Sequence, residues 1–378
     1  MMKRSVLFGA MGVLSTQPLS IEAQIRWSVD ATPVVELGGT RHGDAGALGL
    51  PVGATRLTNG AIAVADQRLS SVRYFGADGK LVKATGTRGQ GPGDFGLITW
   101  LGQCARDSVF VWDMSLRRMT VLDGSGGLAR TYSVPAAASD GAPPFVVACS
   151  GSGAFAFQPS LRNPGTPPTP ELPFVRGRSP VYVGNAAGTY VRRLTEVPEG
   201  ELFVTGLTGG PRGGGPRPLG KTTSLAASGE RIFIGTADSG FVDVYSANGE
   251  RLTPLSLGVP LRRANQERYA AAIEELAKMA PAAMRDRLTT MLQGVPMPDH
   301  LPAYSALHSD SEGLLWVTLT VTGDTETHLR AYDATGTARG EVRLRGGVKV
   351  FEIGRDYILG GYDSSDGEPY VALFRLRR

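Results

Sequence analysis

The stretch that decides the fold is ATRLTNGAIAVADQRLSSVRYFGADGKLVKATG, residues 54–86. Four short strands can be read in it, separated by TNG, QRLSS and GADGK. Gly, Asn and Asp in such short connections are typical of tight hairpin turns. Hydrophobic alternation, as in VRYF, is typical of strands packed against a neighbouring layer. The stretch therefore predicts an antiparallel sheet of four consecutive strands.

The same order of strands and turns recurs along the chain, which indicates a repeat architecture. Five further copies can be read, at 98–134, 145–197, 224–257, 304–344 and 348–376. The last copy stops after its third strand, whereas residues 25–37 read as a strand that belongs to no copy. Placed beside the last copy, this segment would complete it and cover an exposed sheet edge.

We therefore predict an all-β fold: a six-bladed β-propeller of four-stranded antiparallel blades, closed by the N-terminal strand. The composition agrees, because 51 Gly and 25 Pro favour short strands joined by turns over a helical bundle. The prediction places residues 24–378 in a single domain, with a small helical insertion between the fourth and fifth blades.

The segment between the first two blades resembles a linker of known propellers. GTRGQGPGDF, residues 86–95, resembles the Gly-Pro-Gly-acid-Phe linker of NHL-type six-bladed propellers, and residues 37–51 resemble it more weakly. Over nearly its whole mature length the chain is similar to exported bacterial six-bladed propellers of the NHL/TolB-like kind. The resemblance implies the fold but no activity, because this fold hosts binding proteins, lyases and lactonases alike.

The N-terminus and the charge distribution indicate the compartment. Lys3 and Arg4, an apolar run at 6–14 and the small residue Ala23 predict a signal peptide over 1–23. We therefore expect an exported protein, periplasmic or extracellular. No later apolar run predicts a membrane span. The net charge is only +4 and the arginines are scattered, which argues against a nucleic-acid partner.

Two cysteines, Cys104 and Cys149, each end a short apolar strand in neighbouring copies. If these strands are equivalent, the two thiols would lie close together, and an oxidising compartment favours a disulfide. Two buried free thiols, packed as small hydrophobic groups, are the alternative.

The long insertions indicate one functional face. In a four-stranded meander, the connection between the second and third strands and the connection to the next blade emerge at the same end. All long insertions belong to these connections, at 158–180, 206–220 and 258–303. Long loops on a rigid scaffold are where binding residues gather. Within 258–303, helical spacing of apolar residues predicts two helices, which we expect to form a cap over the mouth of the ring.

Candidate ligand-binding residues on this face fall into two groups. Four acids at or just past the ends of second strands either accept backbone N–H bonds or form a ring that binds a cation or basic ligand: Asp66, Asp113, Asp238 and Asp363. Four further residues on the same face could receive an anionic group: Arg68, Arg88, Arg117 and Gln90.

No catalytic constellation can be read from the sequence, and we assign no metal site and no cofactor. The innermost strands offer chiefly Arg56, Gln103 and Glu352, too few acids to hold a calcium ion. Our hypothesis is a monomeric, non-enzymatic binding or scaffold protein that recognises a protein, peptide or glycan on its loop-rich face. The alternative is a lactonase, another hydrolase or a lyase acting in the central shaft, and calcium would enter only there.

Overall fold

The computed structural model describes residues 27–39, 44–105, 107–134, 144–159, 167–187, 189–207, 213–278, 280–319 and 325–378. The signal peptide predicted for 1–23 lies outside these ranges. In the described part of the chain, strands form six antiparallel sheets of four or five strands and one sheet of three.

The first three sheets follow one another along the chain. Sheet 1 contains β3 (Pro51–Arg56), β4 (Ile62–Asp66), β5 (Ser71–Phe75) and β6 (Leu81–Thr85). Sheet 2 contains β7 (Ile98–Ala105), β8 (Ser108–Asp113), β9 (Arg118–Leu122) and β10 (Leu128–Ser133). Sheet 3 contains β11 (Pro144–Cys149), β12 (Ala154–Pro159), β14 (Arg178–Asn185) and β15 (Tyr190–Pro198).

The next three sheets repeat the same strand order. Sheet 4 contains β18 (Ser224–Ser228), β19 (Arg231–Gly235), β20 (Phe241–Ser246) and β21 (Leu255–Ser256). Sheet 5 contains β22 (Ala306–Ser309), β23 (Leu315–Thr318), β24 (Glu326–Tyr332) and β25 (Ala338–Arg345). Sheet 6 contains β26 (Lys349–Ile353), β27 (Tyr357–Asp363) and β28 (Pro369–Arg377), with β1 (Ser28–Val29) and β2 (Val35–Gly38).

Within each sheet, consecutive strands pair, as the turn residues predict. Gly60, between β3 and β4, and Gly79, between β5 and β6, have φ of 85° and 82°, which a residue without a Cβ adopts at no steric cost. The strand boundaries therefore follow from local turn chemistry.

Neighbouring sheets pack face to face, and the hydrophobic core lies between them. The first strands β3, β7, β11, β18, β22 and β26 contact one another in this order, and β26 contacts β3. Sheets 1 and 2 share a buried cluster that includes Val72 and Val111. Sheets 6 and 1 share another, in which Leu359 and Val371 pack with Val64. Each sheet thus contributes apolar side chains to the layers on both of its sides.

A disulfide joins the first strands of sheets 2 and 3. Cys104 of β7 and Cys149 of β11 form it, with their Cα atoms 5.5 Å apart. The two cysteines occupy comparable places near the ends of first strands, which is the relation that their sequence contexts predicted.

The N-terminal segment pairs with the C-terminal strand. Val29 of β1 lies opposite Leu376, and Val35 of β2 lies opposite Leu373, both in antiparallel register with β28. The amides of Asp30 and Val34, between the two strands, also donate to carbonyl oxygens of β28. The edge of β28 that the last repeat leaves open is therefore covered.

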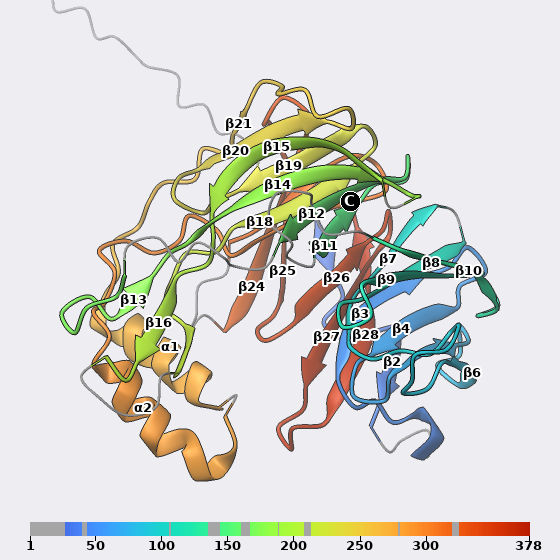
Figure 1. Cartoon of the computed structure of the whole chain (residues 1–378), viewed down its shortest axis with the longest axis horizontal. Coiled ribbons are helices and arrows are strands. Elements are labelled where there is room, and N and C mark those ends of the chain that lie inside the picture. Colours follow the sequence, from blue (N-terminus) through green and yellow to red (C-terminus); the bar gives the residue numbers. More distant parts are fainter. Residues whose placement is uncertain are drawn as a thin grey trace, which may run out of the picture.

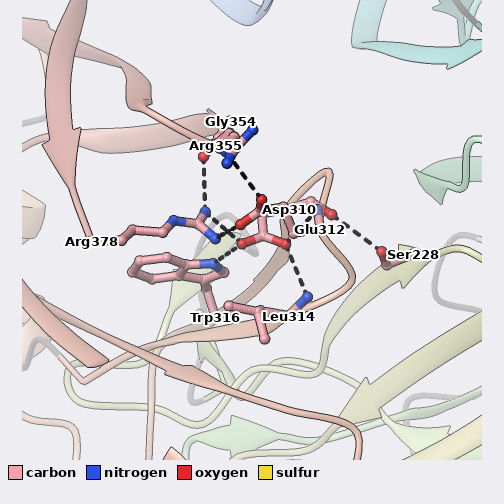
Figure 2. A network of polar contacts seen from close by, with 8 residues as sticks. All are labelled: Ser228, Asp310, Glu312, Leu314, Trp316, Gly354, Arg355 and Arg378. Carbon is pink, nitrogen blue, oxygen red and sulfur yellow. Dashed lines mark hydrogen bonds and ion pairs between the residues drawn. The ribbon is translucent and has the colours of Figure 1, made fainter. Parts of the chain in front are cut away.

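A buried polar network fastens the C-terminal residue to sheet 5 (Figure 2). The carboxylate of Asp310 accepts hydrogen bonds from Trp316 Nε1 at 2.8 Å and from the Leu314 amide at 2.9 Å. Arg378 Nη2 lies 2.7 Å from the same carboxylate and donates to the Gly354 carbonyl at 3.0 Å. One guanidinium thus joins β28 to sheet 5 and to the turn after β26.

Trp27 packs into this junction from the other end of the chain. Its ring centroid lies 5.4 Å from that of Trp316 and 5.1 Å from the Arg378 guanidinium carbon. A Cβ at Gly340 in β25 would collide with the Trp27 ring, so this glycine makes room for the indole. Both described ends of the chain therefore meet between sheets 5 and 6.

Described segments of the three long insertions form, together with β16, an accessory unit at one side of the molecule (Figure 1). A small sheet pairs β13 (Phe174–Val175), β16 (Leu202–Thr205) and β17 (Gly213–Pro216). It packs against α1 (Gln266–Lys278) and α2 (Arg285–Gln293), between which lies the short 3-10 helix η2 (Ala282–Met284). Phe203, Tyr269 and Leu292 lie in the shared core. A buried ion pair between Arg217 and Glu201, at 3.0 Å, lies in the same unit.

Removing the Arg378 guanidinium should destabilise the fold, because the fully buried Asp310 carboxylate loses its charge partner. We expect Arg378→Ala to lower the free energy of unfolding by about 3 kcal/mol in urea denaturation. Arg375→Ala, which alters an exposed side chain of β28 three residues before Arg378, should change it by less than about 0.5 kcal/mol. If the two substitutions lower the free energy of unfolding equally, Arg378 does not act as the charge partner of Asp310.

Candidate functional site

A cavity of about 580 Å³ lies where the first strands of the sheets converge. Its walls include Val52 of β3, Trp100 of β7, Phe145 of β11, His308 of β22 and Lys349 of β26. The connection between sheets 3 and 4 completes the wall with Glu199, Gly200, Thr222 and Thr223. All six sheets or their entry segments therefore contribute to one cavity, whose volume is in the range of small-molecule sites.

The cavity belongs to the end of the molecule at which the insertions emerge. Its lining residues Thr99, Phe145 and Lys349 lie at or next to the beginnings of β7, β11 and β26, where the chain enters each sheet. Glu199 and Thr222 lie outside the sheets, on either side of the accessory strands β16 and β17. The accessory unit is therefore attached beside the cavity.

Aromatic side chains line part of the cavity. Trp100, Phe145 and Phe351 come from sheets 2, 3 and 6. The Trp100 ring is fixed against Phe155 of β12, with ring centroids 6.2 Å apart. These rings offer apolar surface on which a ligand can stack or pack a hydrophobic side chain.

Glu199 is the carboxylate of this site. It follows β15 directly, and only 9% of the residue is exposed. Burial raises the pKa of its carboxyl group, and a hydrogen bond with Ser179 opposes this rise. The backbone of Glu199 is held on both sides, since its amide donates to Gly177 and its carbonyl accepts from Arg176 Nε. The backbone of Glu199 therefore has a fixed position at the cavity wall.

His308 and Lys349 are the two basic groups of the cavity. Burial lowers the pKa of the His308 imidazole to about 4, so this ring is neutral at physiological pH. Its Nε2 lies 3.0 Å from the hydroxyl of Thr318. Burial also lowers the pKa of Lys349, whose ammonium lies 5.5 Å from the Phe351 ring centroid.

The acids predicted at the ends of second strands do not share one environment. Asp66 and Asp113 are fully buried at the ends of β4 and β8. Asp66 accepts N–H bonds from Gly49, Leu50 and Leu69, and Asp113 accepts from the equivalent residues before and after its strand. Both carboxylates therefore hold the connections between sheets in place, which is the structural role that the sequence left open.

Asp238 and Asp363 lie nearer to solvent. Asp238 lies 2.6 Å from Arg176 Nη1 and 3.5 Å from Lys221 Nζ, which ties sheet 4 to segments of the insertions. Burial would raise the pKa of Asp238, but the hydrogen bond and charge of Arg176 lower it overall. Asp363 ends β27 as an exposed residue. None of the four predicted acids lines the cavity.

The predicted cationic and amide residues are also at the surface. Arg68, Arg88, Arg117 and Gln90 are all exposed, and none of them lines the cavity. The Gln90 carbonyl accepts a hydrogen bond from Arg118. The structure thus leaves these four side chains on the surface rather than gathering them into the cavity.

Glu352, the acid expected in the shaft, is engaged elsewhere. It accepts hydrogen bonds from the hydroxyls of Thr55 and Tyr357 and, at 3.2 Å, from the Arg56 amide. Burial raises the pKa of its carboxyl group, and these bonds oppose the rise. Because Thr55 belongs to sheet 1, Glu352 fastens sheet 6 to sheet 1 and does not line the cavity.

The helices of 258–303 have their apolar contacts within the accessory unit, and the cap over the mouth of the ring stays a prediction. They pack on the accessory strands, and no residue of 258–303 is among those that line the cavity. Their apolar stripe, including Tyr269 and Ile273, packs in one cluster with Phe203 of the small sheet. The sequence predicted the helices but gave no signal for the sheet that receives them.

The cavity residues were missed although a sequence signal existed. His308 and Lys349 lie in YSALHS and VKVFEI, both of which were predicted as innermost strands. Glu199 follows a fourth strand in a connection that carries no recognisable motif. In the described ranges, no group of three or more His, Cys, Asp or Glu side chains could hold a metal ion. None of the helices in these ranges has the length and hydrophobicity needed to span a membrane.

Comparison with known proteins places the fold. No protein-family model matches the chain, and no curated protein matches it. Among solved structures, a member of the DUF4221 family from Bacteroides vulgatus has a TM-score of 0.53 at 11% identity, over 94% of this chain and 99% of that one. At this identity the likeness bears on the fold alone.

Two further structures are similar at lower TM-scores. A protein of Bacteroides fragilis named as exported has a TM-score of 0.48 at 12% identity, over 96% of this chain and 97% of that one. Virginiamycin B lyase from Staphylococcus aureus has a TM-score of 0.41 at 12% identity, over 91% and 98% of the two chains. The antiparallel sheets, whose first strands contact one another in a ring, identify the fold as a β-propeller, and the DUF4221 structure is similar to it.

Because His308 is neutral in the folded protein, the free energy of unfolding should depend on pH. Its native pKa of about 4 lies below the ordinary value of 6.5, so the unfolded chain takes up a proton at a higher pH than the native protein. The stability that depends on this difference is complete above pH 6.5 and is lost as the pH falls. Between about pH 7.5 and pH 5, the wild type should lose about 2 kcal/mol relative to His308→Gln.

Denaturant unfolding of both proteins across this pH range measures the difference. A histidine resonance that titrates near 4 by NMR and is missing in His308→Gln would assign the group directly. Parallel pH profiles of the two proteins would contradict the assignment.

Proposed function

We propose that this protein is an exported, non-enzymatic binding protein built as a six-bladed β-propeller. In this proposal residues 24–378 form one monomeric domain, residues 1–23 direct export, and residues 25–37 close the ring as the outer strand of the last blade. The pairing of β1 and β2 with β28 supports closure, because it supplies the strand that the last repeat lacks.

The observation that carries the binding role is the cavity at the convergence of the sheets. It is lined by residues from sheets far apart in sequence and combines aromatic, hydroxyl, amide and titratable side chains. Such a mixture of apolar wall and a few polar groups is typical of ligand sites. The accessory unit beside the opening adds surface through which a larger peptide or glycan would be recognised.

A bulky substitution at the cavity wall tests this role. Thr222 is exposed to the cavity, so Thr222→Trp should fill its opening, whereas Thr253→Trp adds the same side chain at an exposed position that does not line the cavity. Peptides and glycans would be screened by thermal shift. We expect a ligand that raises the Tm of the wild type and of Thr253→Trp but leaves Thr222→Trp unchanged. Equal shifts in all three proteins, or no ligand in either class, would contradict the proposed site.

A further inference from the structure

The two charged groups of the cavity belong to sheets that lie far apart around the ring of contacts. Glu199 follows the last strand of sheet 3, and Lys349 begins sheet 6. Along the order of contacts between first strands, two sheets separate sheet 3 from sheet 6 in either direction. A carboxylate and an ammonium therefore lie on different sides of the same cavity.

Neither charge is neutralised by the other. Among the described residues no ion pair joins Glu199 to Lys349, and no carboxylate pairs with the Lys349 ammonium. Within the part of the chain that the structure describes, Lys349 has only the Phe351 ring beside its ammonium, and Glu199 has only the Ser179 hydroxyl at its carboxyl group. Desolvation disfavours the charged form of both groups, and Lys349 is the more exposed of the two residues. A ligand that brings the opposite charge to each would remove this penalty.

The other residues of the cavity wall suit a ligand that carries amide groups between its two charged ends. Thr99 lines the cavity, and its buried Oγ1 has no hydrogen-bond partner among the described residues. The Gln158 amide and the neutral imidazole of His308 add uncharged polar groups. Trp100 and Phe145 give apolar surface for a side chain.

We propose that the cavity binds a short peptide with free ends, its ammonium group at Glu199 and its carboxylate at Lys349. The proposal rests on the proposed function and deepens it by naming the ligand class. Backbone amides of the peptide would meet the polar groups Thr99 and Gln158, while a side chain packs on the aromatic wall. The volume of about 580 Å³ accommodates a ligand of this size.

Isothermal titration calorimetry with the full chain tests the proposal. The probes are Xaa–Ala dipeptides covering every residue type, their N-acetyl forms, their C-amide forms and the uncharged disaccharide maltose. For the best-bound dipeptide, each cap should weaken binding by about tenfold or more, because each removes a hydrogen bond between charged groups. This comparison uses the wild type and does not depend on any variant folding.

Two variants assign each end of the peptide. Lys349→Gln should weaken binding of the free dipeptide by about tenfold. In this variant, amidation of the dipeptide should not weaken binding further, whereas N-acetylation should still weaken it by about tenfold. Glu199→Gln should show the reverse pattern. Circular dichroism and Tm measurements check that both variants fold. If acetylation and amidation weaken binding by the same factor in each variant as in the wild type, the assignment of the two peptide ends is wrong.

The outcomes separate this proposal from the proposed function. If maltose binds the wild type but not Thr222→Trp, and no dipeptide binds, the cavity is a binding site and the peptide proposal is wrong. If a dipeptide binds equally to the wild type and to Thr222→Trp, the site itself is misplaced and both proposals fail. Binding of capped and free dipeptides with equal affinity would also overturn the peptide proposal.

Discussion

The antiparallel pairing of the N-terminal segment with β28 is the contact on which the rest of the structure depends. Without it, sheet 6 would end in a strand with unpaired amides and carbonyls along one edge. Val29 and Val35 lie opposite residues of β28, and the amides between β1 and β2 also bond to it. The two ends of the described chain are thereby held in one sheet.

The same junction is reinforced by side chains. Arg378 bridges β28 to the buried Asp310, and Trp27 packs on Trp316 between sheets 5 and 6. On the other side of sheet 6, Glu352 accepts a hydrogen bond from Thr55 of sheet 1. Sheet 6 is therefore fixed to both of its neighbours, and with it the wall of the cavity that Lys349 contributes.

Much of the fold could be predicted because its determinants are local. The turns TNG and GADG place glycines such as Gly60 and Gly79 where the backbone needs a positive φ, and the repeat then gives the strand order. Cys104 and Cys149 could be considered as a pair for the same reason, because equivalent positions in neighbouring repeats lie close in space.

The site could be predicted only in part, because it depends on contacts between distant segments. The acids at strand ends were visible, but whether a carboxylate faces a ligand or its own backbone is decided by the amides around it, as at Asp66. The small sheet that receives α1 and α2 is assembled from β13, which lies in the insertion of sheet 3, and from β16 and β17, which lie in the connection between sheets 3 and 4. Glu199 and Lys349 meet in one cavity only after the sheets converge.

Hydrogen–deuterium exchange of the intact chain tests the closure most directly. The amides of Asp30 and Val34 donate to β28, so they should exchange as slowly as those of β27 in the interior of the same sheet. Slow exchange of the Asp30 and Val34 amides is the predicted result. Exchange of these two amides at the rate of an unstructured peptide, while β27 remains protected, would contradict the account.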